Sequence, residues 1–150
     1  MRTSGVLHPG LIELIAAAGH GDHIVLADAG LRIPDDKARI DLGVTCGVPT
    51  MAQVVAAVKQ ELVIEAAIVA TEFSDWNPDV YRDVTGLLEV EPTAKPHAEL
   101  MADAAESAFA YVKTGECTAY SSVVLVCGVN YLDEAVALYK ELHPVAPDPF

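Results

Sequence analysis

IVLA at residues 24–27 and VVLV at residues 123–126 are two runs of consecutive apolar residues, and they decide the fold of this chain. A short continuous apolar run is typical of a strand that is covered on both faces of a sheet. Weaker strand patterns occur at residues 39–42, 66–70, 88–90 and 111–116. Helical patterns of apolar residues separate them, at residues 9–18, 50–62, 78–85, 99–108 and 133–142.

The alternation of helix and strand patterns indicates the fold class. Helices that alternate with strands cover both faces of the sheet that the strands form. We therefore predict an α/β fold, a single three-layer α/β/α domain over residues 1–150 with a mainly parallel or mixed sheet. Thr50 and Gln53 have the spacing of a capping box, which predicts the start of the second helix.

Charge and composition argue against several classes of protein. The chain has 150 residues, with 9 Lys and Arg against 22 Asp and Glu, and a net charge of −13. This negative field argues against nucleic acid or an anionic membrane as the main partner. Hydrophobic residues make up 52% and charged residues 21%, which indicates a packed core rather than disorder. No apolar segment approaches the ~20 residues of a membrane-spanning helix, so we predict a soluble, cytoplasmic protein.

The cysteines agree with that location. Cys46, Cys117 and Cys127 are odd in number and have no CxxC spacing. This usage fits a reduced cytoplasm better than a disulfide framework. The N-terminal stretch has Arg2 as its single basic residue, and its apolar run is broken early, so no export signal is expected.

The densest polar cluster is GHGDH at residues 19–23, just before the first apolar run, and Asp28 follows that run. Polar residues at strand ends are where α/β proteins usually place sites. Two plain alternatives stay open, a helix-end contact for His20 and a turn role for Asp28. His20, Asp22 and His23 resemble a metal cluster but lack a third His or Cys nearby, so no metal is expected. The sequence has no P-loop, GxGxxG or GxSxG motif, and we predict no cofactor.

A set of segments, taken together, resembles the D-ribose pyranase / L-fucose mutarotase family. The resemblance covers roughly residues 5 to 129. The matching segments are GHGD at 19–22, IVLADAGL at 24–31, IDLG at 40–43, GVPT at 47–50, ELVIE at 61–65, ATE at 70–72, TGE at 114–116 and CGV at 127–129. Residues 130–150 then form a C-terminal extension beyond the shorter ribose enzymes, and we expect its helix to cover a subunit contact.

The resemblance implies an enzyme that interconverts cyclic forms of a monosaccharide. The family's proton donor falls on His20, and its substrate-binding residues fall on Asp28, His97 and Tyr120. The spacing from His97 to the TGE segment differs from the family by one residue. Ser122 stands where the family usually has Asn; its shorter side chain offers one hydroxyl in place of a two-donor amide.

The substrate class has three candidate interpretations. Residues 28–30 and 40–42 look like the ribose branch, whereas residues 77–80 and 108–110 look like the fucose branch. We favour a D-ribose pyranase, with an L-fucose-type mutarotase as the alternative. A non-catalytic sugar-binding or transport-accessory protein is the third possibility, because Ser122 departs from the family.

Mutarotation needs a group that can both give and take a proton near neutral pH, and His suits that task. If residues 24–27 form a straight strand at ~3.3 Å per residue, His20 and Asp28 lie more than ~13 Å apart. One small sugar cannot touch both within one chain unless the segment curls. The resemblance favours a site completed by a neighbouring subunit, because the family forms ring-shaped homo-oligomers, commonly decamers.

Overall fold

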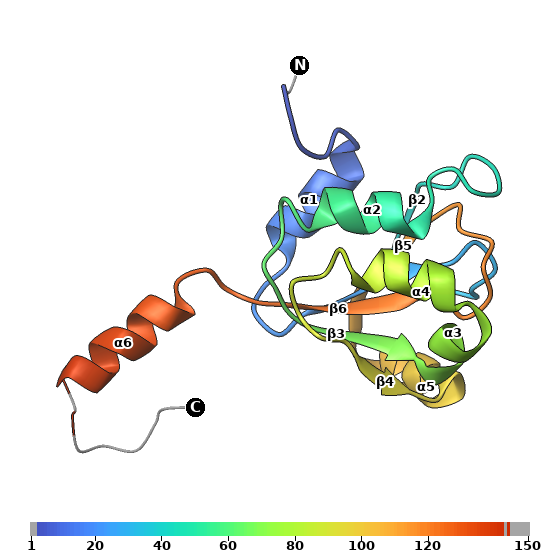
Figure 1. Cartoon of the computed structure of the whole chain (residues 1–150). Coiled ribbons are helices and arrows are strands. Elements are labelled where there is room, and N and C mark those ends of the chain that lie inside the picture. Colours follow the sequence, from blue (N-terminus) through green and yellow to red (C-terminus); the bar gives the residue numbers. More distant parts are fainter. Residues whose placement is uncertain (1–2, 143, 145–150) are drawn as a thin grey trace.

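The computed structural model describes residues 3–142 and 144, and a six-stranded sheet lies at its centre (Figure 1). The strand order is β2-β5-β1-β6-β3-β4. The strands are β1 (His23–Ala27), β2 (Ala38–Asp41), β3 (Ile64–Ala70), β4 (Thr93–Lys95), β5 (Ala108–Lys113) and β6 (Val123–Cys127). β6 runs antiparallel to β1 and β3, whereas the β1–β5, β2–β5 and β3–β4 pairings are parallel. The prediction of a mainly parallel or mixed sheet is confirmed.

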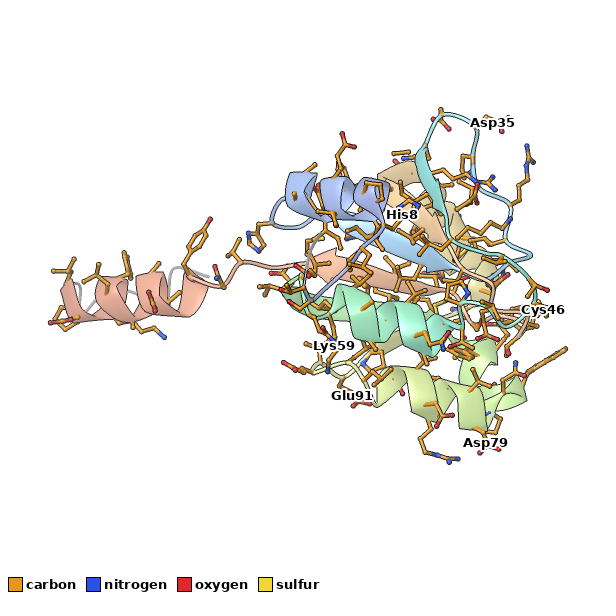
Figure 2. All side chains as sticks on the ribbon, turned by 90° about the horizontal axis from the view of Figure 1, so that it is seen from above. His8, Asp35, Cys46, Lys59, Asp79 and Glu91 are labelled. Atoms are coloured by element: carbon orange, nitrogen blue, oxygen red, sulfur yellow. A yellow bond between two sulfur atoms is a disulfide. The ribbon has the colours of Figure 1, made fainter. Side chains whose placement is uncertain are left out.

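Helices cover both faces of this sheet. They are α1 (Pro9–Ala17), α2 (Met51–Val58), α3 (Thr71–Trp76), α4 (Pro78–Thr85), α5 (His97–Ser107) and α6 (Leu132–Leu142). In Figure 1, α1 and α2 lie above the sheet and α5 lies below it, which gives the predicted three layers. α6 extends away from the sheet in both views (Figures 1 and 2). No helix in the described part of the chain is long and apolar enough to cross a membrane.

Helix α2 begins at the capping box that the sequence predicts. The Thr50 hydroxyl accepts a hydrogen bond from the backbone N–H of Gln53 at 3.2 Å, and the Gln53 side chain accepts one from the N–H of Thr50 at 2.9 Å. The predicted capping box is therefore present. It satisfies two backbone donors that the helix leaves without partners at its start.

The two apolar runs occupy the middle of the sheet. Val25 and Leu26 of β1 and Val123 and Leu125 of β6 are fully buried. β1 and β6 are neighbours in the sheet and are covered on both sides, which explains why their sequences are continuously apolar.

The predicted strand at 88–90 is wrong. These residues are irregular, and the nearby strand is β4, between Pro92 and Pro96. β4 pairs with β3 alone, at the edge of the sheet, where residues without a backbone N–H are tolerated. Leu88 is nonetheless buried, because it packs into the core from the loop.

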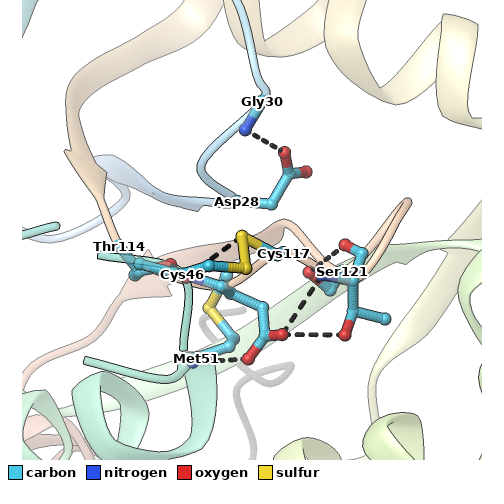
Figure 3. The surroundings of a disulfide bond; sticks show 10 residues. Asp28, Gly30, Cys46, Met51, Thr114, Cys117 and Ser121 are labelled. Atoms are coloured by element: carbon cyan, nitrogen blue, oxygen red, sulfur yellow. Dashed lines mark hydrogen bonds between the residues drawn. A yellow bond between two sulfur atoms is a disulfide. The ribbon is translucent and has the colours of Figure 1, made fainter. Parts of the chain in front are cut away.

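The prediction of unpaired cysteines is wrong for two of the three. Cys46 and Cys117 form a disulfide, with their Cα atoms 5.7 Å apart (Figure 3). Their separation of 71 residues hides this proximity in the sequence. Backbone hydrogen bonds join the two loops: Gly47 N–H donates to Gly115 O at 2.7 Å, and Gly115 N–H donates to Pro49 O at 2.8 Å. Cys127 is free and buried.

The Glu116 side chain connects α2 to the loop between β5 and β6. Its carboxylate accepts hydrogen bonds from Met51 N–H at 3.1 Å, Thr118 N–H at 3.2 Å and the Thr118 hydroxyl at 2.7 Å. Burial raises the pKa of this carboxyl, but the hydrogen bonds from Thr118 and Met51 outweigh that effect and lower the pKa overall. The Glu116 carbonyl also accepts from Ala29 N–H at 2.7 Å, so Glu116 ties together three segments.

We expect Leu125→Ala to lower the free energy of unfolding by about 2–5 kcal/mol, because it leaves a cavity at the centre of the sheet. Leu138→Ala is the matched control, since Leu138 is 55% exposed on α6. Urea denaturation followed by circular dichroism measures both. Equal midpoints for the two variants would contradict the assignment of the core.

We expect Glu116→Gln to destabilise the protein by about 1–3 kcal/mol at pH 7, because three hydrogen bonds lose a charged acceptor. The pKa of Glu116 is lower in the folded protein than its ordinary value of 4.5. The stabilisation is therefore complete above pH 4.5 and is lost as the pH falls through the folded-state value. Denaturation from pH 3 to pH 7 should show the wild type and the variant converging in acid. A difference of the same size at every pH, or one shared by Glu91→Gln at an exposed glutamate, counts against this role.

Candidate functional site

Five strands have their carboxyl ends along one edge of the sheet, the edge formed by strand ends and not by an outer strand, and β6 begins there. β1, β2, β3, β4 and β5 all point the same way, since β6 alone is antiparallel to its neighbours. In α/β sheets, ligands bind outside the carboxyl ends of the strands. A cavity of about 730 Å³ lies at this edge. It is lined by residues 28–32 after β1, by His97 and Met101 of α5, and by residues 116–120 before β6.

Asp28 enters this cavity from the end of β1, and its carboxylate is held on both oxygens. Oδ1 accepts from Gly30 N–H at 2.9 Å, and Oδ2 accepts from the Ser122 hydroxyl at 2.8 Å. The Ser122 oxygen in turn accepts from Asp28 N–H at 3.0 Å. Ser122 is 1% exposed and contacts Asp28 in a reciprocal pair. Asp28 therefore has a defined orientation, with its remaining lone pairs free to accept from a ligand hydroxyl.

Tyr120 is held in a left-handed backbone conformation, with φ of 63°. Non-glycine residues rarely adopt this region, and they do so mainly where surrounding contacts require it. The Tyr120 ring packs edge-on against His97, with centroids 5.1 Å apart, and against Trp76, with centroids 5.3 Å apart. The loop itself is held by Asn77, whose side-chain amide donates to Ala119 O at 2.9 Å. The phenol is thus placed by α3, α4 and α5 together.

His97 is the first residue of α5 and is anchored by Glu72. The backbone N–H of His97 donates to the Glu72 carboxylate at 2.9 Å. The pKa of Glu72 is lower than its ordinary value, because the backbone N–H groups of Glu72 itself and of His97 donate hydrogen bonds to its carboxylate. Desolvation of the carboxylate opposes this effect. The Nδ1 atom of the His97 ring is buried and has no hydrogen-bond partner within the described residues.

His20 lies at the opposite edge of the sheet. It belongs to the turn before β1, whereas Asp28 follows β1, and the five-residue strand from His23 to Ala27 spans roughly 13 Å. Its Nε2 atom is 2.8 Å from the Glu65 carboxylate, and the two side chains are 48% and 37% exposed. The structure therefore brings Asp28, His97 and Tyr120 to one cavity and leaves His20 outside it within the same chain.

The cluster of His20, Asp22 and His23 does not converge on one point. His20 contacts Glu65, Asp22 accepts from Gly19 N–H at 2.8 Å, and His23 Nδ1 is 3.2 Å from the Ser107 hydroxyl. Within the described residues, no group of three or more potential metal ligands is gathered.

Residue-by-residue analysis of the sequence missed three carboxylates: Glu65, Glu72 and Glu116. Each occurs inside a segment that carried the family resemblance, ELVIE, ATE and TGE. Each contacts a residue far away in the sequence. Glu65 lies 45 residues from its partner His20, Glu72 lies 25 residues from His97, and Glu116 lies 65 residues from Met51. Their place inside these segments was the signal that the sequence offered. Their contacts with His20, His97 and Met51 became visible only in the folded structure.

Comparison with known proteins shows the family of this chain. Residues 1–130 match the RbsD / FucU transport protein family. The chain is 44% identical over 131 residues to a D-ribose pyranase from Paracidovorax citrulli, covering 87% of this chain and 100% of that protein. It is 39% identical to a D-ribose pyranase from Geobacillus thermodenitrificans, covering 87% of this chain and 99% of that protein.

Solved structures show the same fold. RbsD from Bacillus subtilis, complexed with D-ribose, superposes with a TM-score of 0.80 at 34% identity, covering 86% of this chain and 98% of that one. The fucose mutarotase of Streptococcus pneumoniae, in complex with L-fucose, has a TM-score of 0.65 at 22% identity, covering 81% of this chain and 93% of that one; this likeness concerns the fold alone. From its sequence and its architecture, this chain belongs to the RbsD / FucU transport protein family.

Proposed function

We propose that the protein is an isomerase that opens and recloses the ring of a free monosaccharide, with D-ribose as the favoured substrate. The observation that carries the proposal is the cavity in which Asp28, His97 and Tyr120 meet. These are three of the four residues that the family resemblance assigns to sugar binding; Ser122 is the fourth. The 44% identity to a D-ribose pyranase and the likeness to RbsD with bound D-ribose support the same substrate.

The chemistry is a pair of proton transfers. One proton leaves the anomeric hydroxyl while another reaches the ring oxygen, and the C–O bond of the hemiacetal breaks to give the open aldehyde. Reclosure on the other face exchanges anomers, and reclosure through another hydroxyl exchanges pyranose and furanose. A single acid–base group contributes ~10²–10⁴-fold. Sugars already mutarotate unaided, so this contribution together with orientation is sufficient.

Each cavity residue has a role that its contacts support. Asp28 accepts from a sugar hydroxyl, because both its oxygens are oriented by Gly30 and Ser122. Tyr120 and His97, which line the same cavity, bond to further hydroxyls of the sugar. Ser122, assigned to substrate binding by the resemblance, acts on the sugar through Asp28, since its hydroxyl proton already bonds to that carboxylate.

His20 supplies the acid–base group from a neighbouring subunit. It is half exposed and lies at the far end of β1 from the cavity, so it faces outward from its own chain. The proposal therefore includes a homo-oligomer, a decamer by resemblance to the family, with sites at subunit interfaces. It places the protein in the cytoplasm, where free sugar is metabolised.

We expect His20→Ala to lower the rate of D-ribose exchange by about 10²–10⁴-fold, because the proton relay is lost. Saturation-transfer NMR between the anomeric protons of D-ribose, and of L-fucose in parallel, measures the rate. His23→Ala is the matched control, a histidine three positions away that contacts Ser107. An undiminished rate in His20→Ala, or no acceleration of either sugar by the wild type, overturns the proposal.

The same assay tests the shared site. His20→Ala and Asp28→Asn should each be inactive alone, but co-expressed subunits should regain activity, up to about a quarter of the sites in a random mixture. Absence of recovery in purified mixed oligomers would place both residues in one subunit. Faster exchange of L-fucose than of D-ribose would establish the fucose-type alternative. Calorimetric binding of ribose by a wild type without exchange activity would establish a sugar-binding protein instead.

A cytoplasmic enzyme must also work with its thiols reduced. We expect the double variant Cys46→Ser, Cys117→Ser to keep the wild-type exchange rate, because backbone hydrogen bonds at Gly47 and Gly115 still join the two loops. The assay is repeated with and without dithiothreitol. Loss of activity in the double variant and in reduced wild type would contradict the cytoplasmic assignment.

A further inference from the structure

Glu65 occupies a special position at the start of β3. Ile64 pairs with Cys127 and Ala66 pairs with Val126, so Glu65 is the extra residue of a β-bulge. A bulge redirects the side chain of its extra residue, and bulges are common beside active sites. Gly128 leaves room for it, since a Cβ at that position would lie 3.0 Å from the Cβ of Glu65.

The turn that carries His20 is attached to the same end of β6. Gly21 N–H donates to Cys127 O at 2.8 Å, and Cys127 N–H donates to Asp22 O at 2.8 Å. Gly21 has φ of 81°, a conformation that favours glycine. The last residue of β6 therefore sets the position of the histidine turn, and the bulge beside it sets the position of Glu65. The result is the 2.8 Å contact between His20 Nε2 and the Glu65 carboxylate.

We propose that Glu65 is the positioning residue of His20, an inference that rests on the proposed function. An ionised carboxylate only accepts hydrogen bonds, so it selects the tautomer whose proton is on Nε2. The lone pair is then on Nδ1, and within the described residues that atom makes no hydrogen bond. Nδ1 is thus the atom that takes a proton from the sugar and returns it. Glu65 holds the ring plane and stabilises the imidazolium that forms, as the carboxylate partner of a catalytic histidine does.

A purely structural role explains this pair poorly. Both side chains are partly exposed, at 48% and 37%, and exposed ion pairs contribute little to folding. The bulge at Glu65 and the glycine at position 128 nevertheless fix the place of this exposed pair. Orientation and protonation of the imidazole are what the arrangement controls.

Asp22 and Cys127 are titratable groups close to this pair within the described part of the chain. Asp22 is on the same turn as His20 and accepts from Gly19 N–H. Cys127 ends β6, and burial, with Asp22 and Glu65, raises its pKa to about 11, so it remains a neutral thiol. The charged group that faces the imidazole ring at hydrogen-bond distance is Glu65.

The experiment compares Glu65→Ala and Glu65→Gln with Glu89→Gln, which removes a carboxylate from a surface ion pair with Lys59. We expect Glu65→Ala to lower kcat for ribose exchange about 10–100-fold with KM unchanged, because Glu65 acts through His20 and not on the sugar. Glu65→Gln should retain part of the rate, since its amide oxygen still accepts from Nε2–H. In both variants the acid limb of the pH–rate profile should move to lower pH. Glu89→Gln should behave as the wild type.

Long-range 1H–15N NMR of the imidazole gives a readout that a merely structural role would not move. The wild type should show His20 protonated on Nε2 and unprotonated on Nδ1, and Glu65→Ala should show a mixture of tautomers. Wild-type kcat, pH profile and tautomer in Glu65→Ala, beside an inactive His20→Ala, overturn this inference and leave the proposed function intact. An active His20→Ala overturns the proposed function itself.

Discussion

The antiparallel direction of β6 is the constraint on which the rest of the structure depends. The strand lies between β1 and β3, so its first residues reach the edge where the other strands end, and its last residues reach the opposite edge. Ser122 therefore meets Asp28 beside the cavity. Cys127 meets the His20 turn at the other end, next to the bulge that carries Glu65. A strand of five residues thus organises both halves of the proposed site.

Carboxylates hold the site residues in place, in a chain with a net charge of −13. Glu116 binds the start of α2 and the loop that leads to Tyr120, and Glu72 binds the start of α5 at His97. Asp28 is itself oriented by Gly30 and Ser122. Backbone N–H groups and hydroxyls, rather than Lys or Arg, satisfy most of these oxygens. The result is a preorganised polar wall, which suits recognition of a neutral, hydroxyl-rich ligand such as a sugar.

The proposed reaction needs few groups from the protein, and this architecture contains them. Ring opening requires one imidazole at neutral pH and a wall that orients hydroxyls, and it requires no group that stabilises a large charge. These parts lie at opposite ends of the strands in one chain, so in the proposed assembly one subunit would present the wall and its neighbour would present the imidazole. α6 lies outside the matched residues 1–130 and extends from the β6 end of the sheet that also carries His20. The expectation that it covers a subunit contact remains a prediction of the same assembly.

Local sequence determined the elements whose causes are local. The apolar runs at 24–27 and 123–126 appear as central strands, and Thr50 and Gln53 form their capping box, because side-chain periodicity and caps act over a few residues. Resemblance to a family supplied Asp28, His97 and Tyr120, which the fold then brings to one cavity. Tertiary structure alone decided that β4 replaces the expected strand at 88–90, that Cys46 pairs with Cys117, and that Glu65 faces His20. These features join segments tens of residues apart, and their geometry depends on the order and direction of strands in the sheet, which no local pattern encodes.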